Sequence, residues 1–127
     1  MIDPDVRRHL DATPLAHVAT VAPDGAPHSV PVWVGTHADR IAFLTGPRSR
    51  KARNLRHDPR VALSLTATDD PFTPVVVRGR VVEWLDGDAA WEIADEIARK
   101  YVGASYPRGE ERVVALVEPE HQRLGVG

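Results

Sequence analysis

Short apolar runs separated by turn-forming residues occupy most of the chain, a pattern typical of antiparallel β-strands. The runs predict strands at 15–21, 27–35, 40–45, 60–66, 75–85 and 112–117. The first two flank a turn built from Ala22-Pro23-Asp24-Gly25-Ala26, so we expect them to form a hairpin. Asp69-Asp70-Pro71 is expected to interrupt the chain before the longest run.

Three other segments have the signals of helices. Asp3 and Pro4 suit the cap and first residue of a short N-terminal helix. Ser49 is a good N-cap for a helix over about 50–57. From Asp88 onward, apolar residues recur every three or four positions, which predicts a helix packed against the strands. The residues of this stripe are Ala90, Trp91, Ala94, Ile97, Ala98 and Tyr101.

Together these elements predict a mainly β fold, an antiparallel β-barrel of Greek-key type with about six strands and two to three flanking helices. Closure of a barrel removes the unpaired edges that such strands would otherwise expose. Gly79 lies in the middle of the run 75–85 and indicates a bend there, and Pro119 is expected to end the last strand. Residues 1–127 are expected to form a single domain.

The second predicted strand has two different faces. His28, Val30, Val32 and Val34 alternate on one side, which we expect to be the core side. Trp33 points to the other side, next to Pro31. It either anchors an interface or forms a flat wall for a planar ring.

Composition narrows the function classes. Cysteine is absent, which excludes disulfides, thiolate metal sites and cysteine nucleophiles. The six histidines, at positions 9, 17, 28, 37, 57 and 121, form no metal-ligand pair, so we expect no metal site. No apolar run approaches membrane-spanning length and the first residues are acidic, so we expect a cytoplasmic protein without a membrane partner.

Positive charge is concentrated in one segment. Residues 48–60 hold six of the sixteen Lys and Arg residues and one acid, Asp58, although the whole chain has a formal charge of −2. Such a cluster is either a solvated helix face or a binding site for an anion. Lys51 lies in the first turn of the predicted helix, where a cation is unfavourable unless an anion such as phosphate neutralises it.

The same helix is expected to be amphipathic. Ala52 and Leu55 would form its narrow buried side. The polar face would consist of Arg50, Arg53, Asn54 and His57.

Five segments, 15–21, 23–33, 43–45, 51–55 and 58–63, resemble the pyridoxamine 5'-phosphate oxidase-like split-barrel superfamily. The order is a strand, an Asp-Gly turn, a strand, a Lys-x-x-Asn-Leu helix and an Asp-Pro-Arg strand, and the resemblance runs from about residue 5 to residue 118. Within this superfamily the chain is most similar to actinobacterial enzymes that use the deazaflavin coenzyme F420. The implied fold is an FMN-binding split barrel.

The resemblance also implies a homodimer with two cofactor sites at the subunit interface. Thr45, Ser49 and Lys51 match the positions that hold the cofactor phosphate, with Arg53 and Asn54 as helpers. In the family, one strand lies beside the tricyclic ring of the cofactor. The residues of this chain that match that strand are Pro31, Val32, Trp33 and Val34. The guanidinium groups of Arg48, Arg50 and Arg56 have no family counterpart, and they suit the oligoglutamate tail of F420 better than the bare phosphate of FMN.

The implied activity is that of an F420-dependent oxidoreductase, which transfers a hydride between F420 and a conjugated small molecule. Few catalytic side chains are needed for such chemistry, and none is assigned. Solvent, His28 or Tyr106 could supply a proton. Without the arginine-containing C-terminal tail of true pyridoxamine phosphate oxidases, oxidation of vitamin B6 is not expected.

Two other readings stay open. One is an FMN-binding oxidoreductase of the same fold. The other is a non-catalytic protein that binds F420, haem or single-stranded nucleic acid. No aromatic residue lies between Phe43 and Phe72 to stack on bases, so a nucleic-acid partner is not expected.

Overall fold

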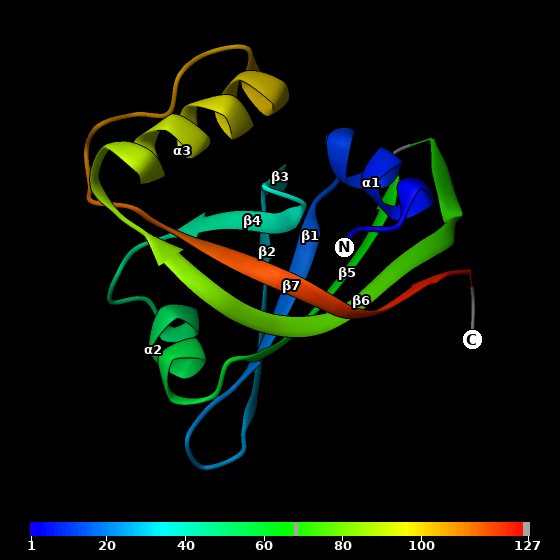
Figure 1. Cartoon of the computed structure of the whole chain (residues 1–127), viewed down its shortest axis with the longest axis horizontal. Coiled ribbons are helices and arrows are strands. Elements are labelled where there is room, and N and C mark those ends of the chain that lie inside the picture. Colours follow the sequence, from blue (N-terminus) through cyan, green and yellow to red (C-terminus); the bar gives the residue numbers. More distant parts are fainter. Residues whose placement is uncertain (68, 126–127) are drawn as a thin grey trace.

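The computed structural model describes residues 1–67 and 69–125. Its elements follow the order α1 (Pro4–Asp11), β1 (Ala16–Val21), β2 (Pro27–Val32), β3 (Gly35–His37), β4 (Arg40–Thr45), α2 (Arg50–His57), β5 (Arg60–Ala67), β6 (Asp70–Leu85), α3 (Gly87–Val102) and β7 (Val113–Leu124). Figure 1 shows a strongly curled sheet with α3 and α2 on different sides of it and α1 near the N-terminus.

All strand pairs are antiparallel, and the seven strands form one sheet in the order β2-β1-β5-β6-β7-β4-β3. The predicted mainly β, antiparallel architecture is therefore confirmed. In the described part of the chain no ladder joins β2 to β3, the two ends of this order, so the sheet curls without closing. The predicted hairpin of β1 and β2 is present, with Val18 opposite Val30.

The seventh strand arises because the predicted strand 27–35 is divided into two. Its backbone leaves the ladder after Val32. The N–H of Val34 donates to the hydroxyl of Tyr101 at 3.1 Å. The carbonyl of Val34 accepts from the ammonium group of Lys100 at 2.6 Å. Side chains of α3 thus take the backbone groups that a continuous ladder would use, and β3 begins separately at Gly35.

A bulge lets β7 continue beyond the point where we expected it to end. The register shifts between Arg78 and Gly79, and Gly79 lies opposite Pro119. A Cβ on Gly79 would approach the Glu118 carbonyl oxygen to 2.1 Å, so the close contact needs glycine. The predicted bend at Gly79 is confirmed. The predicted end at Pro119 is wrong, because the bulge accommodates a residue that has no N–H to donate.

The other boundary that differs lies at the start of β6. We expected Asp69-Asp70-Pro71 to interrupt the chain, but β6 begins at Asp70 and pairs there with Ala67 of β5. The interruption predicted at Asp69 is confirmed, because Asp69 lies in the turn between the two strands, but Asp70 and Pro71 already belong to β6.

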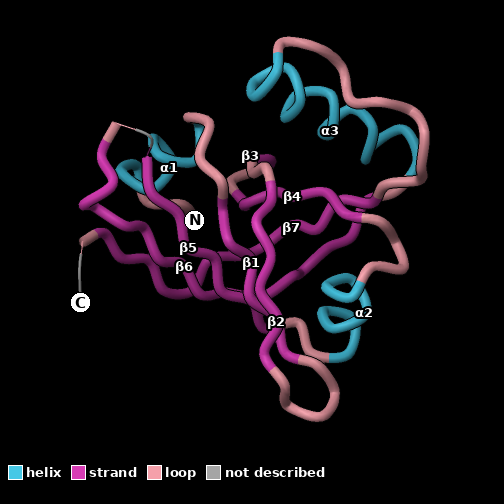
Figure 2. The backbone as a smooth tube through the Cα atoms, turned by 180° about the vertical axis from the view of Figure 1, so that it is seen from behind, coloured by secondary structure: helices cyan, strands magenta, loops and turns pink. Residues whose placement is uncertain are grey.

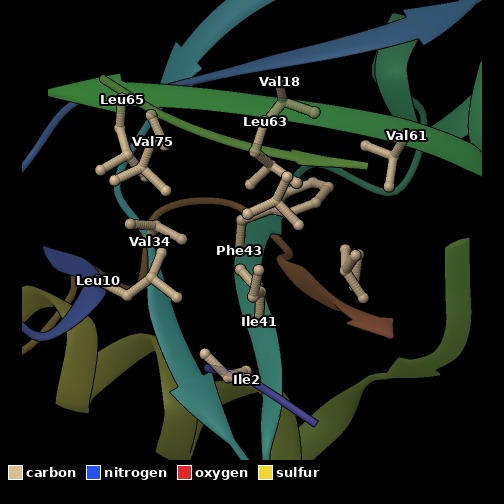
Figure 3. Close-up of a cluster of buried hydrophobic side chains, with 14 of the residues drawn as sticks. Ile2, Leu10, Val18, Val34, Ile41, Phe43, Val61, Leu63, Leu65 and Val75 are labelled. Atoms are coloured by element: carbon tan, nitrogen blue, oxygen red, sulfur yellow. The ribbon is translucent and has the colours of Figure 1, made fainter. Parts of the chain in front are cut away.

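Two apolar clusters hold the fold together. The larger lies inside the curl of the sheet and includes Leu10, Phe43 and Leu63, each of them fully or almost fully buried (Figure 3). The smaller lies between α3 and the sheet and includes Ile93, Ile97, Val114 and Leu116. The stripe predicted for α3 is confirmed by the burial of Ala90, Ala94, Ile97 and Ala98, and Trp91 and Tyr101 lie half-buried at its edges.

Candidate functional site

A pocket of about 850 Å³ opens between β2, the connection from β4 to α2, and the loop that follows α3. Figure 2 shows from behind that this loop returns to the sheet close to the connection from β4 to α2. The pocket is lined by Leu15, Pro31, Val32, Trp33, Leu44, Thr45, Gly46, Pro47, Arg48, Ser49, Lys51, Tyr106, Glu110, Glu111 and Arg112.

The first wall of the pocket, which we call the α2 wall, is the segment 45–51. Ser49 is the N-cap of α2, as predicted, and its hydroxyl accepts from the N–H of Ala52 at 3.1 Å. The same oxygen lies 2.7 Å from the hydroxyl oxygen of Thr45. The hydroxyls are thereby fixed where β4 ends and α2 begins, next to the positive end of the helix dipole.

Asn54 fixes α2 to the sheet and does not reach the pocket. It is fully buried, and its amide group donates to the Thr20 hydroxyl of β1 at 3.0 Å. The prediction that Asn54 shares the polar face with Arg50 is wrong, because Asn54 lies on the buried side with Ala52 and Leu55. Asn54 is therefore not one of the residues that line the pocket.

Lys51 contributes positive charge to the pocket. Its side chain lines the pocket, and in the described part of the chain it forms no ion pair. Burial lowers the pKa of the Lys51 ammonium group, and the charge of Arg112 lowers it further. A bound anion would raise the pKa of Lys51 again and so offset both effects, because a nearby negative charge favours the charged ammonium form.

The other cations of the basic segment divide into two groups. Arg48 lines the pocket, whereas Arg50 and Arg53 are exposed on α2 outside the lining. Arg56 also lies outside the lining. Its guanidinium group donates to the Pro47 carbonyl at 2.6 Å and lies 4.9 Å from the centre of the Trp84 ring.

Arg60 is already neutralised by an acid. It forms an ion pair with Asp58 at 2.7 Å. The hydrogen bonds from Arg60 lower the pKa of the Asp58 carboxyl to about 2. Only Arg48 and Lys51 of the predicted cationic cluster therefore line the pocket.

The flat wall of the pocket comes from β2 and the residue after it. Pro31, Val32 and Trp33, which the resemblance places beside the coenzyme ring, line the pocket. Val34 does not line it, because its side chain is fully buried in the core and its backbone groups are bonded to α3. The Trp33 indole stacks on Tyr101 with ring centres 5.1 Å apart and an angle of 9° between planes.

The second wall, which we call the loop wall, is the segment 106–112. Sequence reasoning considered only Tyr106 here, as a proton donor, and missed Glu110, Glu111 and Arg112. The Arg112 guanidinium donates to the Tyr106 hydroxyl at 3.3 Å and to the Glu111 carbonyl at 3.0 Å. His28, the other proton donor considered, lies outside the lining.

Asp95 of α3 holds the loop wall in place. Its carboxylate accepts from the Tyr106 N–H at 3.0 Å and from two nitrogens of Arg108, each at 2.8 Å. The Arg108 hydrogen bonds lower the pKa of the Asp95 carboxyl to about 2. The Arg108 guanidinium also lies 4.2 Å from the centre of the Trp91 ring.

Comparison with known proteins gives this pocket a context. The sequence matches the family model described as Pyridoxamine 5'-phosphate oxidase over residues 2–124. The chain belongs to this family. The resemblance found in the sequence and the predicted split-barrel fold are thereby confirmed. No curated protein matches the chain.

Solved structures extend the comparison. A structure described as an F420 reductase is 26% identical, has a TM-score of 0.84, and the match covers 96% of this chain and 98% of that one. A conserved hypothetical protein from Mycobacterium tuberculosis is 24% identical, with a TM-score of 0.81 and coverage of 98% and 84%. A putative 5-nitroimidazole antibiotic resistance protein from Bacteroides thetaiotaomicron is 18% identical, with a TM-score of 0.72 and coverage of 98% and 84%.

The last two of these similarities establish the fold alone. The family match and the similarity to the F420 reductase support an oxidoreductase-type function. Among residues 1–67 and 69–125, no helix is both long and apolar enough to span a membrane.

Proposed function

We propose that the protein is an F420-dependent oxidoreductase that transfers a hydride between coenzyme F420 and a conjugated small molecule, in the direction of substrate reduction. One observation carries the proposal: a single pocket joins the flat wall of Pro31, Val32 and Trp33 to the cations and hydroxyls of the α2 wall. A ligand that fits both has a planar ring and an anionic tail, which is the constitution of a flavin-type coenzyme.

The residues present fit such a coenzyme. The pocket volume of about 850 Å³ lies in the range common for cofactor sites. Thr45, Ser49 and Lys51 would hold its phosphate, and the flat wall of Pro31, Val32 and Trp33 would support its ring. When bound, the coenzyme supplies the hydride, while the chain's residues position both reactants and exclude water.

The distribution of positive charge favours F420 over FMN. Arg48 and Arg112 line the pocket in addition to Lys51. Arg48 forms no ion pair in the described part of the chain, and Arg112 is paired only with the exposed Glu110 there. Guanidinium groups bind carboxylates well, and the oligoglutamate tail of F420 is rich in carboxylates. FMN has only its phosphate for these three cations.

Tyr106 is the pocket residue best suited to donate a proton. Its hydroxyl oxygen accepts from Arg112, and within the described residues the O–H has no acceptor. The proton is therefore available to a ligand. The guanidinium group would stabilise the phenolate left behind.

The test is a pair of titrations of the purified protein with F420 and with FMN, followed by absorbance and fluorescence. We expect tighter binding of F420, and oxidation of the reduced coenzyme when a conjugated acceptor is added. Preferential binding of FMN would support the FMN-binding oxidoreductase instead. Binding of F420 without turnover of any acceptor would support a non-catalytic carrier, and binding of neither would overturn the assignment.

We also propose that the protein acts as a homodimer with the pocket at the subunit interface. Leu15 supports this, because its side chain lines the pocket and is 56% exposed in the single chain. An apolar side chain at a pocket rim gains from being covered. Light scattering should give the mass of a dimer, and Leu15→Asp should shift it toward the monomer. A monomeric wild-type protein would contradict this part of the proposal.

A further inference from the structure

Arg112 bridges the two walls of the pocket. It precedes β7 directly, and Val113 pairs with Thr45, the last residue of β4. A Cβ on Gly46 would lie 3.8 Å from a terminal nitrogen of Arg112. The guanidinium group therefore lies beside the chain segment that leads into α2, although 60 residues lie between Lys51 and Arg112 in the sequence.

The contacts of Arg112 are of two kinds. The Tyr106 hydroxyl and the Glu111 carbonyl, at 3.3 and 3.0 Å, are neutral acceptors that orient the guanidinium group. Its charged partner is Glu110, at 3.3 Å. The side chain of Arg112 is only 22% exposed, whereas that of Glu110 is 79% exposed.

This asymmetry makes Glu110 a weakly held partner. An ion pair with one highly solvated member contributes little, because water competes for the carboxylate and salt screens the charges. Arg112 stays at the pocket without Glu110, since its two neutral contacts come from other groups. A second anion that reaches the pocket would meet both Arg112 and Lys51.

We propose that Arg112 binds an oxyanion of the ligand, a phosphate or a carboxylate, in place of the Glu110 carboxylate. Glu110 is then a displaceable counter-ion that competes with the ligand. The inference rests on the proposed function only in that the ligand occupies this pocket. It assigns to the loop wall a binding residue that the basic segment 48–60 does not contain.

Competition predicts opposite effects for two neighbouring substitutions. Glu110→Gln removes the competitor and should tighten oxyanion binding by about two- to fivefold. Arg112→Gln removes the binding group and should weaken it about tenfold. When Arg112→Gln is already present, Glu110→Gln should have no further effect, because the competitor has lost its target.

The experiment is a titration of the ligand-free protein with inorganic phosphate and, separately, with triglutamate, monitored by NMR at the Nε–Hε signal of Arg112. We expect this signal to shift on binding of at least one probe. A response to phosphate indicates a phosphate subsite, and a response to triglutamate indicates a carboxylate subsite. Two control variants, Glu83→Gln and Arg53→Gln, make the same charge changes outside the pocket lining and should leave both affinities within about twofold.

Three outcomes would overturn the inference. The first is that the Arg112 signal does not shift with either probe. The second is that the Glu110→Gln substitution weakens oxyanion binding or leaves it unchanged, and the third is that Glu83→Gln has an effect as large as that of Glu110→Gln. Failure of the proposed function looks different. A protein that binds neither F420 nor FMN but still shows the Glu110 and Arg112 effects has the oxyanion site without the coenzyme. A protein that binds F420 with no such effects has the coenzyme site without this role for Arg112.

Discussion

The α2 wall and the loop wall face the same pocket but are held in place by different forces. The α2 wall rests on buried contacts, the hydrogen bond from Asn54 to Thr20 and the packing of Leu55 in the core. The loop wall rests on the carboxylate of Asp95 and its bonds to Arg108 and Tyr106, much closer to solvent.

This difference separates two properties of the site. Neutral buried bonds do not respond to pH or salt, so the position of Lys51 should persist as long as the protein is folded. Bonds to an ionised carboxylate near the surface weaken when it is protonated or screened. Binding strength can therefore be changed at the loop wall without loss of the fold, whereas changes beneath the α2 wall affect both.

The largest effect on binding is expected from Lys51→Met. A charged hydrogen bond is worth about 1.5–3 kcal/mol, so the affinity for the coenzyme should fall roughly 10- to 100-fold. Titration followed by coenzyme fluorescence measures it. Arg53→Met is the matched control, because Arg53 is exposed on the same helix outside the pocket. The affinity of this variant for the coenzyme should stay within about twofold of the wild-type value. Equal losses in the two variants would show that the helix acts only through its overall charge.

Asn54→Ala tests the buried support of the α2 wall. Loss of the bond to Thr20 inside the core should lower the free energy of unfolding by about 1–3 kcal/mol. Urea denaturation measures this. Arg53→Ala, at the adjacent exposed position, should stay within about 0.5 kcal/mol of wild type. If Asn54→Ala is as stable as wild type, buried bonds do not distinguish the two walls.

Tyr106→Phe should weaken the loop wall alone. Arg112 loses one of the contacts that orient it, at a cost of about 0.5–1.5 kcal/mol, so coenzyme affinity should fall roughly 2- to 10-fold while thermal stability is unchanged. Tyr101→Phe should do the reverse, since the Tyr101 hydroxyl bonds to the backbone of Val34 and Pro14 and ties α3 to β2. A stability loss in Tyr106→Phe equal to that in Tyr101→Phe would contradict this division.

The two walls also differ in how far the sequence predicts them. The α2 wall depends on local signals: Ser49 as N-cap, Lys51 in the first turn, and a helix whose predicted bounds agree with the structure. Asn54 was misplaced because a short helix of mostly polar residues does not show which polar residue is buried. Its partner, Thr20, lies on a strand 34 residues earlier.

The loop wall depends on pairing between distant segments. Arg112 reaches the pocket because β7 pairs with β4 and places Val113 opposite Thr45. Nothing in residues 103–112 indicates that register. The division of strand 27–35 was missed for the same reason, because Lys100 and Tyr101 of α3 take the backbone groups of Val34.

Lowering the pH is expected to have the smallest effect on the stability of the whole protein. This effect should also be the one most confined to the loop wall. The pKa of the Asp95 carboxyl is about 2 in the folded protein and 3.8 when the carboxyl has no contacts, as in the unfolded chain. Between these two pH values the native state therefore binds fewer protons than the unfolded state. The stability that Asp95 contributes is therefore complete above pH 3.8 and is lost as the pH falls toward 2. The protection of the Tyr106 amide against hydrogen exchange, measured relative to an unfolded chain at the same pH, should fall in this window, and in Asp95→Asn it should be low already at neutral pH.

Asp58 supplies the matched comparison, because the pKa of its carboxyl is also lowered to about 2, but by Arg60 at the other end of α2. Asp58→Asn should leave exchange at Tyr106 as in wild type at every pH. If both substitutions accelerate it equally, acid acts on the molecule as a whole. The loop wall would then not be a separately adjustable part of the site.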